Sequence, residues 1–211
     1  TGIDRHTRPF SAINLLLTTR CNMNCLYCYG GAGREQGLPG GSYGLAGEDM
    51  SPATARLAVD YLLKTAAQRA GGDPGGINFF GGEPLVNREA LRAVLAYAEE
   101  QAARFALDLP HFSITTNGTL IDDEFLDLAR RFELSVQVSF DGTRSAQEQL
   151  RPFPESYDVV CRAFERLAAH HIPVRVRATL TSLNTSVMDT LRNLESLGVE
   201  QVHFAPATAR A

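Results

Sequence analysis

Residues 12–28 read AINLLLTTRCNMNCLYC, a short apolar run that is followed at once by three cysteines. The run Ala12–Thr18 has the length and composition of a buried strand. Cys21, Cys25 and Cys28 then follow with C-x3-C-x2-C spacing, which places three thiols on the loop after this strand. Three thiolates this close together can bind one metal ion or one inorganic cluster.

The cysteine triad favours a site with an open coordination position. A closed structural zinc site needs four ligands, yet the remaining cysteine, Cys161, is remote and the nearest histidine, His6, precedes the strand. Four cysteines placed this way also make a poor disulfide framework. A structural zinc site and three buried thiols remain the simple alternatives. Cys161 lies on an apolar helical stripe, which predicts a small buried hydrophobe.

Beyond the triad, short apolar runs alternate with helical patterns, which is typical of βα units around a parallel sheet. Six strands are predicted, at Ala12–Thr18, Gly76–Phe80, His111–Thr116, Leu134–Phe140, Ile172–Leu180 and Val199–Ala205. Five helices are predicted between them, with the first beginning at Ser51–Pro52 and the others marked by apolar stripes around 91–98, 125–132, 160–167 and 187–194. The acidic start and basic end of the third helix, 122–131, match a helix dipole and predict solvated termini.

Three of the predicted strands alternate polar and apolar residues, over 112–117, 136–141 and 174–179. Strands that are buried on both faces usually read as continuous apolar runs. With helices on one face, the other face must therefore meet water or a polar ligand. The pattern predicts an α/β fold that is a partial (β/α)6 TIM-type barrel, with parallel strands and outer helices.

Composition narrows the class of partner. The chain has 211 residues, 44% hydrophobic residues and a formal net charge of −4, with no basic block. We therefore expect neither a nucleic-acid partner nor an anionic membrane. The apolar runs are far shorter than the roughly 20 residues that span a bilayer, and no signal-peptide pattern is visible. A soluble, cytoplasmic protein is expected.

Three further motifs follow successive strands. They are Gly81-Gly82-Glu83-Pro84, Thr116-Asn117-Gly118-Thr119 and Ser139-Phe140-Asp141-Gly142. Together with the triad and Tyr27, directly before its third cysteine, they resemble the radical S-adenosylmethionine (SAM) enzymes over Ile13 to Pro206. The resemblance implies that Cys21, Cys25 and Cys28 hold a [4Fe–4S] cluster. It also implies that SAM binds the open iron and is cleaved reductively to a 5′-deoxyadenosyl radical, with electrons from a flavodoxin or ferredoxin.

The resemblance also implies SAM contacts at the strand ends. Gly81 and Gly82 allow a close backbone approach, and Glu83 can accept hydrogen bonds from the SAM ammonium, although a tight turn would also explain this motif. Thr116 and Asn117 are expected at the same site.

On the later strands, Ser139 is expected to bind the ribose hydroxyls, with Asp141 secondary because it can instead cap the following loop. Arg177 can pair with the SAM carboxylate, but Arg175 shares its face of the strand and remains an alternative. Tyr27 is expected beside the cluster or the adenine. His203 is either a substrate contact or a core residue.

The glycine-rich segment 30–49 and the Ser-x-Asp-Gly element resemble the branch that matures peptides and proteins, which includes the anaerobic sulfatase maturases. Residues 1–211 are then expected to be the core domain of an oxidoreductase-type maturase, a fragment lacking a C-terminal domain with auxiliary clusters. An enzyme of small-molecule or cofactor biosynthesis and a non-catalytic metal or iron–sulfur module are the alternatives. Segment 30–49 is either a gating lid or a connector.

Overall fold

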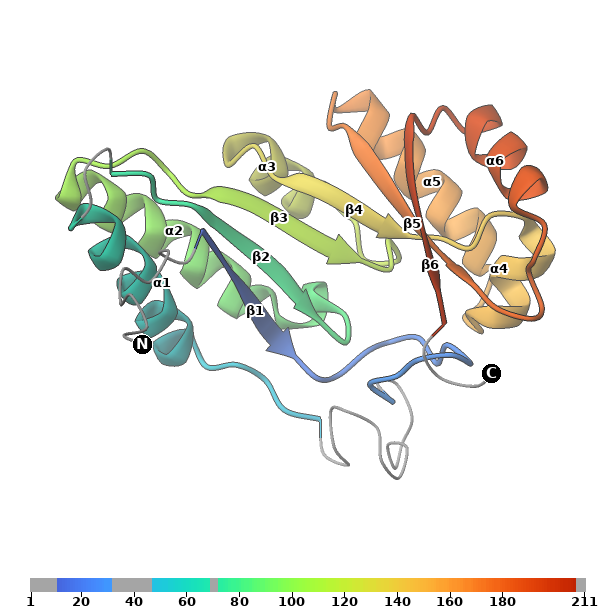
Figure 1. Cartoon of the computed structure of the whole chain (residues 1–211), viewed down its shortest axis with the longest axis horizontal. Coiled ribbons are helices and arrows are strands. Elements are labelled where there is room, and N and C mark those ends of the chain that lie inside the picture. Colours follow the sequence, from blue (N-terminus) through green and yellow to red (C-terminus); the bar gives the residue numbers. More distant parts are fainter. Residues whose placement is uncertain (1–10, 32–46, 69–71, 208–211) are drawn as a thin grey trace, which may run out of the picture.

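The computed structural model describes residues 11–31, 47–68 and 72–207 (Figure 1). Its centre is one sheet of six parallel strands in the order β1-β2-β3-β4-β5-β6. The strands are β1 (Ala12–Thr18), β2 (Gly76–Gly81), β3 (His111–Thr116), β4 (Ser135–Ser139), β5 (Val174–Leu180) and β6 (Gln201–Pro206). Because β1 and β6 are the edges and do not pair with each other, the sheet is an open barrel. The predicted partial (β/α)6 barrel is confirmed.

The helices lie on the outer side of this curved sheet (Figure 1). They are α1 (Pro52–Ala67), α2 (Arg88–Phe105), α3 (Asp123–Arg131), α4 (Arg144–Leu150), α5 (Ser156–Ala169) and α6 (Val187–Ser196), with a 3-10 turn η1 (Pro84–Asn87) before α2. Ser51 caps α1 as predicted, because its side chain accepts a hydrogen bond from the backbone N–H of Thr54. None of the helices in these ranges is long and apolar enough to cross a membrane.

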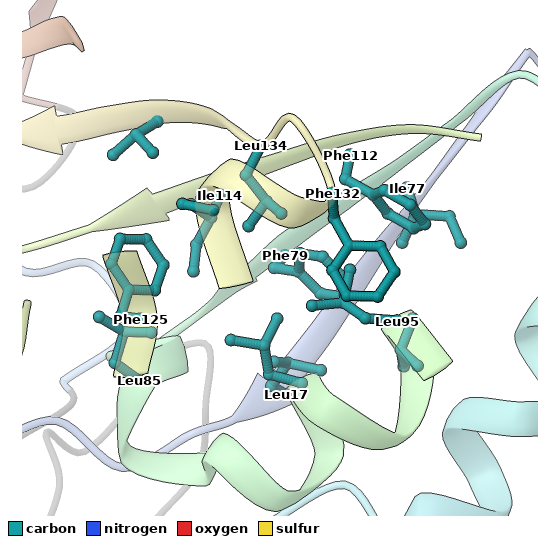
Figure 2. Close-up of a cluster of buried hydrophobic side chains, with 14 of the residues drawn as sticks. Leu17, Ile77, Phe79, Leu85, Leu95, Phe112, Ile114, Phe125, Phe132 and Leu134 are labelled. Atoms are coloured by element: carbon teal, nitrogen blue, oxygen red, sulfur yellow. The ribbon is translucent and has the colours of Figure 1, made fainter. Parts of the chain in front are cut away.

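The predicted alternation along the strands separates a core from a polar inner face. On the outer face, Phe79 and Phe112 are buried and stack with ring centroids 6.1 Å apart (Figure 2). On the inner face, the Asn78 amide donates to Asn14 at 2.8 Å, and the Ser113 hydroxyl donates to Asn78 at 3.1 Å. The concave side of the barrel is therefore lined with hydrogen-bonding groups, as a polar ligand requires.

Three strands begin later than predicted, and one feature explains all three. An apolar residue assigned to the strand instead belongs to the turn that caps the preceding helix. It follows a residue with left-handed backbone and donates its N–H to a carbonyl of that helix. The three residues are Leu134 (after Glu133, φ 49°, to Ala129 O), Ile172 (after His171, φ 56°, to Leu167 O) and Val199 (after Gly198, φ 73°, to Leu194 O).

Helix α4 is absent from the sequence prediction. Its seven residues, RSAQEQL, bury Ala146, Gln147 and Leu150, so a polar glutamine occupies the face that packs inward. Periodicity of apolar residues therefore gives no helix signal there. The glycine-rich segment 30–49, predicted to be a lid or a connector, lies outside the described residues over 32–46.

Candidate functional site

A pocket of about 420 Å³ opens at the carboxyl ends of the strands. Most of the predicted site residues line it, namely Cys21, Cys25, Tyr27, Cys28, Gly81, Gly82, Thr116, Asn117, Ser139 and Arg177. Glu83 and Asp141 do not line it, and both are fully buried behind it. The motifs that follow successive strands therefore converge on one site, as expected for parallel strands.

The three cysteines are free, half-buried thiols on the loop after β1. Burial raises the pKa of the Cys21 thiol to about 12, and burial likewise raises the pKa of Cys25. Burial of this kind penalises thiolates, and a positively charged metal centre would stabilise them. No group of three His, Cys, Asp or Glu side chains within the described ranges is arranged to hold a single metal ion.

One end of the cysteine loop is held by the loop after β3. The Asn117 amide donates to Asn22 Oδ1 at 2.8 Å and lies 3.8 Å from Cys21 Sγ. Asn22 in turn donates to Thr119 Oγ1 at 2.8 Å. Asn117, predicted as a SAM contact, therefore also fixes the position of a cysteine.

The two glycines after β2 pack against the start of the same loop. The N–H of Gly82 donates to Thr18 O at 2.8 Å, and the N–H of Glu83 donates to Arg20 O at 2.8 Å. A Cβ atom on Gly81 would lie 2.3 Å from Thr18 O, and one on Gly82 would lie 2.2 Å from Arg20 O. The close approach that requires glycine is therefore to the chain's own backbone, whatever these residues also do for a ligand.

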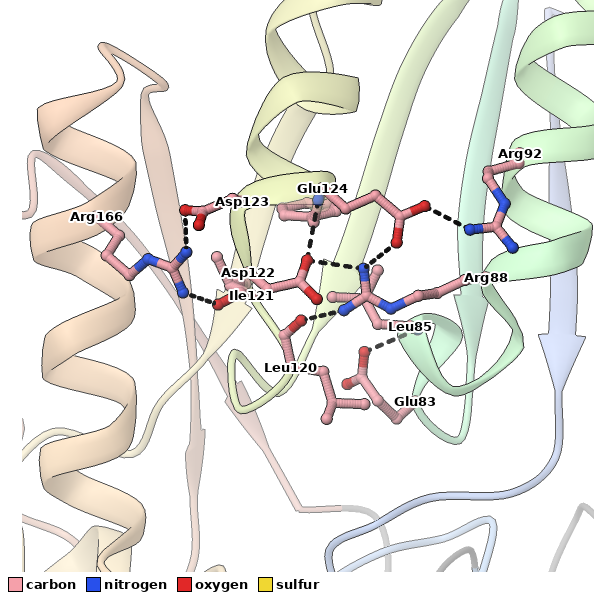
Figure 3. A network of polar contacts seen from close by, with 11 residues as sticks. Glu83, Leu85, Arg88, Arg92, Leu120, Ile121, Asp122, Asp123, Glu124 and Arg166 are labelled. Carbon is pink, nitrogen blue, oxygen red and sulfur yellow. Dashed lines mark hydrogen bonds and ion pairs between the residues drawn. The ribbon is translucent and has the colours of Figure 1, made fainter.

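Glu83 holds the β2 and β3 loops together from behind the pocket. Its buried carboxylate accepts hydrogen bonds from Leu85 N–H (3.1 Å), Thr116 Oγ1 (2.7 Å) and Asn117 N–H (2.6 Å) (Figure 3 draws the first). Burial raises the pKa of Glu83 to about 7, and the three donors oppose this shift. Both oxygens are thus occupied within the protein, and the contact of Glu83 with the SAM ammonium stays a prediction.

Asp141 holds the other end of the cysteine loop. Its buried carboxylate accepts hydrogen bonds from Tyr27 Oη at 2.5 Å, Arg151 Nε at 2.8 Å and the Thr179 N–H at 2.9 Å. The N–H of Asp141 donates to Gln147 Oε1 at 3.0 Å. One side chain after β4 therefore connects the cysteine loop, β5 and the end of α4.

Sequence reasoning missed two residues that contact the site, Arg151 and Gln147. Arg151 lines the pocket, its guanidinium lies 5.4 Å from the centre of the Tyr27 ring, and its Nη1 lies 3.9 Å from Cys25 Sγ. Gln147 lies on α4, and Arg151, four positions later, is the residue that follows the last residue of that helix. The spacing of Gln147 and Arg151 just after Asp141-Gly142 was the available signal. It could be recognised only if α4 had been predicted.

The structure separates the two candidate arginines on β5. Arg177 lines the pocket beside Ser139, its register partner on β4, whereas Arg175 donates to Gln201 at 2.9 Å and borders a second pocket of about 690 Å³. Within the described chain, neither the Arg177 guanidinium nor the Ser139 hydroxyl has a hydrogen-bond or ion-pair partner. His203, paired in register with Arg177, is exposed and lines neither pocket.

Ion pairs on the outer surface hold the loop between β3 and α3 (Figure 3). Arg88 donates to Leu120 O at 2.5 Å and pairs with Asp122 at 2.9 Å. Arg166 donates to Ile121 O at 2.6 Å and pairs with Asp123. The acidic start of α3 is exposed, as predicted, and it also pairs with arginines of the neighbouring helices.

Comparison with known proteins identifies related sequences. A model of the Radical SAM superfamily matches residues 15–197. An uncharacterized protein of Methanocaldococcus jannaschii is 27% identical over 195 residues, which are 90% of this chain and 60% of that protein. A probable GTP 3′,8-cyclase of Methanopyrus kandleri is 30% identical over 217 residues, covering 96% of this chain and 62% of the cyclase.

A solved structure shares the fold. That of anSMEcpe with bound AdoMet and Cp18Cys peptide aligns with a TM-score of 0.75 at 20% identity, over 94% of this chain and 51% of that chain. At this identity the likeness concerns the fold alone. This chain spans between about a half and two thirds of the proteins named here.

Replacing Glu83 tests its role behind the pocket. Glu83→Gln leaves one acceptor oxygen where two now serve three donors, so a backbone N–H of Leu85 or Asn117 loses its partner. We expect a loss of about 1–3 kcal/mol in the free energy of unfolding, measured by urea denaturation of the metal-free protein. The exposed neighbour Glu89 provides the matched control, since Glu89→Gln should change stability by less than about 0.5 kcal/mol. Equal effects of the two substitutions would contradict the assignment.

Proposed function

Because this chain belongs to the Radical SAM superfamily, we propose that Cys21, Cys25 and Cys28 hold a [4Fe–4S] cluster and that the adjoining pocket binds SAM. One observation carries this proposal. Three half-buried thiols share a pocket with an arginine, Arg177, that has no partner among the described residues. Soft ligands for iron and an unpaired cation for a carboxylate therefore lie in the same cavity.

The residues present fit these cofactors. Cysteine thiolates are the usual ligands of iron–sulfur clusters, and the described lining of the pocket contains no fourth Cys and no His, Asp or Glu. A three-thiolate site with an open position is therefore what this chain offers. When bound, the reduced cluster and SAM supply a 5′-deoxyadenosyl radical that removes a hydrogen atom from an inert C–H bond.

The pocket residues have distinct proposed roles toward SAM. Arg177 pairs with the carboxylate, and Ser139, beside it in register, binds the ribose hydroxyls. The backbone at Gly81 and Gly82 forms part of the wall without adding side-chain bulk. The Tyr27 ring and the buried Met23 add apolar surface next to the thiols, which excludes water from the reacting centre.

We also propose that the substrate is a side chain of a peptide or protein, with a flavodoxin or ferredoxin as reductant. The pocket is lined by Ala205, Pro206 and Ala207 of β6 and the residue after it, and the outer edge of β6 has no strand partner among the described residues. An extended peptide can pair with such an edge and so bring a side chain to the pocket. The peptide in the anSMEcpe structure supports this proposal.

A small-molecule substrate is the second candidate. The relative from Methanopyrus kandleri, a probable GTP 3′,8-cyclase, is 30% identical over most of this chain, and its name assigns it a nucleotide substrate. In either case residues 1–211 supply the radical SAM core. For the peptide or protein substrate, we also propose that an auxiliary domain completes the maturase.

The remote cysteine provides a control for the cluster. We expect the anaerobically reconstituted 211-residue chain to contain about four iron atoms and to release 5′-deoxyadenosine from SAM in the presence of dithionite. Cys28→Ala should lose both properties, whereas Cys161→Ala, on α5, should keep both. Iron analysis and chromatography of the nucleoside measure the outcome. A wild-type protein with one zinc ion, or with a cluster that leaves SAM intact, would instead be a metal-binding module.

The two arginines of β5 form a second matched pair. Arg177→Met removes a charge-assisted hydrogen bond, so we expect SAM to bind about 10- to 100-fold more weakly, equivalent to ~1.5–3 kcal/mol. Arg175→Met, which changes a residue outside this pocket, should change the dissociation constant less than about twofold. Equilibrium dialysis with radiolabelled SAM measures both. A larger effect at Arg175 would reverse the assignment.

Deuterium transfer separates the two substrate classes. Protein, SAM and reductant are incubated with perdeuterated peptides in one set of reactions and with deuterated nucleotides in another. Because the abstracted atom ends on the 5′ carbon, we expect mass spectrometry to detect deuterium in 5′-deoxyadenosine with peptides only. Deuterium incorporated from the nucleotides alone would favour the small-molecule candidate.

A further inference from the structure

We propose that Arg151 raises the reduction potential of the cluster through the Cys25 sulfur, and that Asp141 and Tyr27 position its guanidinium for this task. The inference rests on the proposed function, because it needs a cluster on the three cysteines. It assigns to Arg151 a role toward the protein's own thiolate.

The guanidinium is held in one orientation. Asp141 accepts hydrogen bonds from Arg151 Nε at 2.8 Å and Nη2 at 3.5 Å, and the Tyr27 ring lies against the group at 5.4 Å. Among the described residues, the contact of Nη1 is with Cys25 Sγ, at 3.9 Å. The ion pair thus uses two nitrogens of Arg151 and directs the third toward the sulfur.

Burial makes this contact electrostatically strong. The Arg151 side chain is 7% exposed and that of Asp141 is 0% exposed. Interactions between charges are screened much less in such surroundings than at the surface. The planar fork of arginine also keeps the N–H direction fixed, which a lysine ammonium would not do.

The three sulfurs have unequal surroundings. Cys25 faces a cationic donor, whereas the side-chain donor near Cys21 is the neutral amide of Asn117 at 3.8 Å. In the described part of the chain, no side chain donates to Cys28 Sγ. The charge of Arg151 therefore acts mainly on the Cys25 sulfur.

Reduction of a [4Fe–4S]²⁺ cluster adds one electron from a low-potential reductant and gives [4Fe–4S]⁺, so the cluster and its thiolates become more negative by one charge. An N–H donor or cation beside a thiolate stabilises that form more than the oxidised form. Hydrogen bonds to the sulfurs are among the factors that set cluster potentials. Arg151 should consequently make the cluster easier to reduce.

The test compares midpoint potentials of the reconstituted 211-residue chain and its variants without SAM, by titration with EPR detection. Arg151→Lys keeps a positive charge beside Asp141 but removes the directed Nη1 group. The double variant Arg151→Gln, Asp141→Asn removes both charges and therefore leaves no unpaired charge buried. It keeps the test possible if Arg151→Lys does not fold. Arg20→Met is the control, because Arg20 immediately precedes the triad yet is exposed and paired with Asp49.

We expect Arg151→Lys to shift to more negative potential, by about tenfold in the ratio of reduced to oxidised cluster at fixed applied potential, or about 59 mV. The double variant should shift in the same direction by a smaller amount, because it also removes the opposing charge of Asp141. Arg20→Met should match the wild type. Potentials unchanged in Arg151 variants that hold a full complement of iron would overturn this inference. Failure of the wild type to assemble a cluster would instead overturn the proposed function, so the two failures are distinguishable.

Discussion

The site depends on one buried carboxylate. Asp141 has no exposed surface, and its oxygens receive hydrogen bonds from the cysteine loop, the end of α4 and β5. A carboxylate without partners at this depth would cost several kcal/mol, and breaking a buried ion pair typically costs about 3–5 kcal/mol. Tyr27 and Arg151 are therefore held firmly, and the loop between Cys25 and Cys28 takes its position from them.

A second buried carboxylate has a similar function on the other side. Glu83 joins the loops after β2 and β3, and Asn117 extends this connection to Asn22 and Cys21. The cysteine loop leaves β1 at one edge of the sheet, yet Asp141 and the end of α4 hold it from the β4 side. Polar networks suit this purpose because each requires a specific partner and geometry, whereas apolar packing would tolerate several positions of the loop.

The sequence predicted the barrel, the strand order along the chain and the convergence of the motifs, because hydrophobic periodicity and motif placement are local signals. It missed α4, since Gln147 occupies the buried face and removes the apolar period. It also missed Arg151, whose importance arises from its contact with Cys25, 126 positions away in the chain. The glycines after β2 were recognised, but the backbone that crowds them, at Thr18 and Arg20, becomes visible only in three dimensions.

The two arginines of the pocket differ in whether a carboxylate of the protein neutralises their charge. The charge of Arg151 is balanced by Asp141 at 2.8 Å, which weakens its attraction for a free anion in the cavity. Arg177 faces the same cavity and is balanced by no carboxylate among the described residues. We therefore propose that anion binding falls to Arg177, and that the fixed guanidinium of Arg151 acts on the nearest sulfur. A pocket with two cations can in this way hold one anionic group at a defined place.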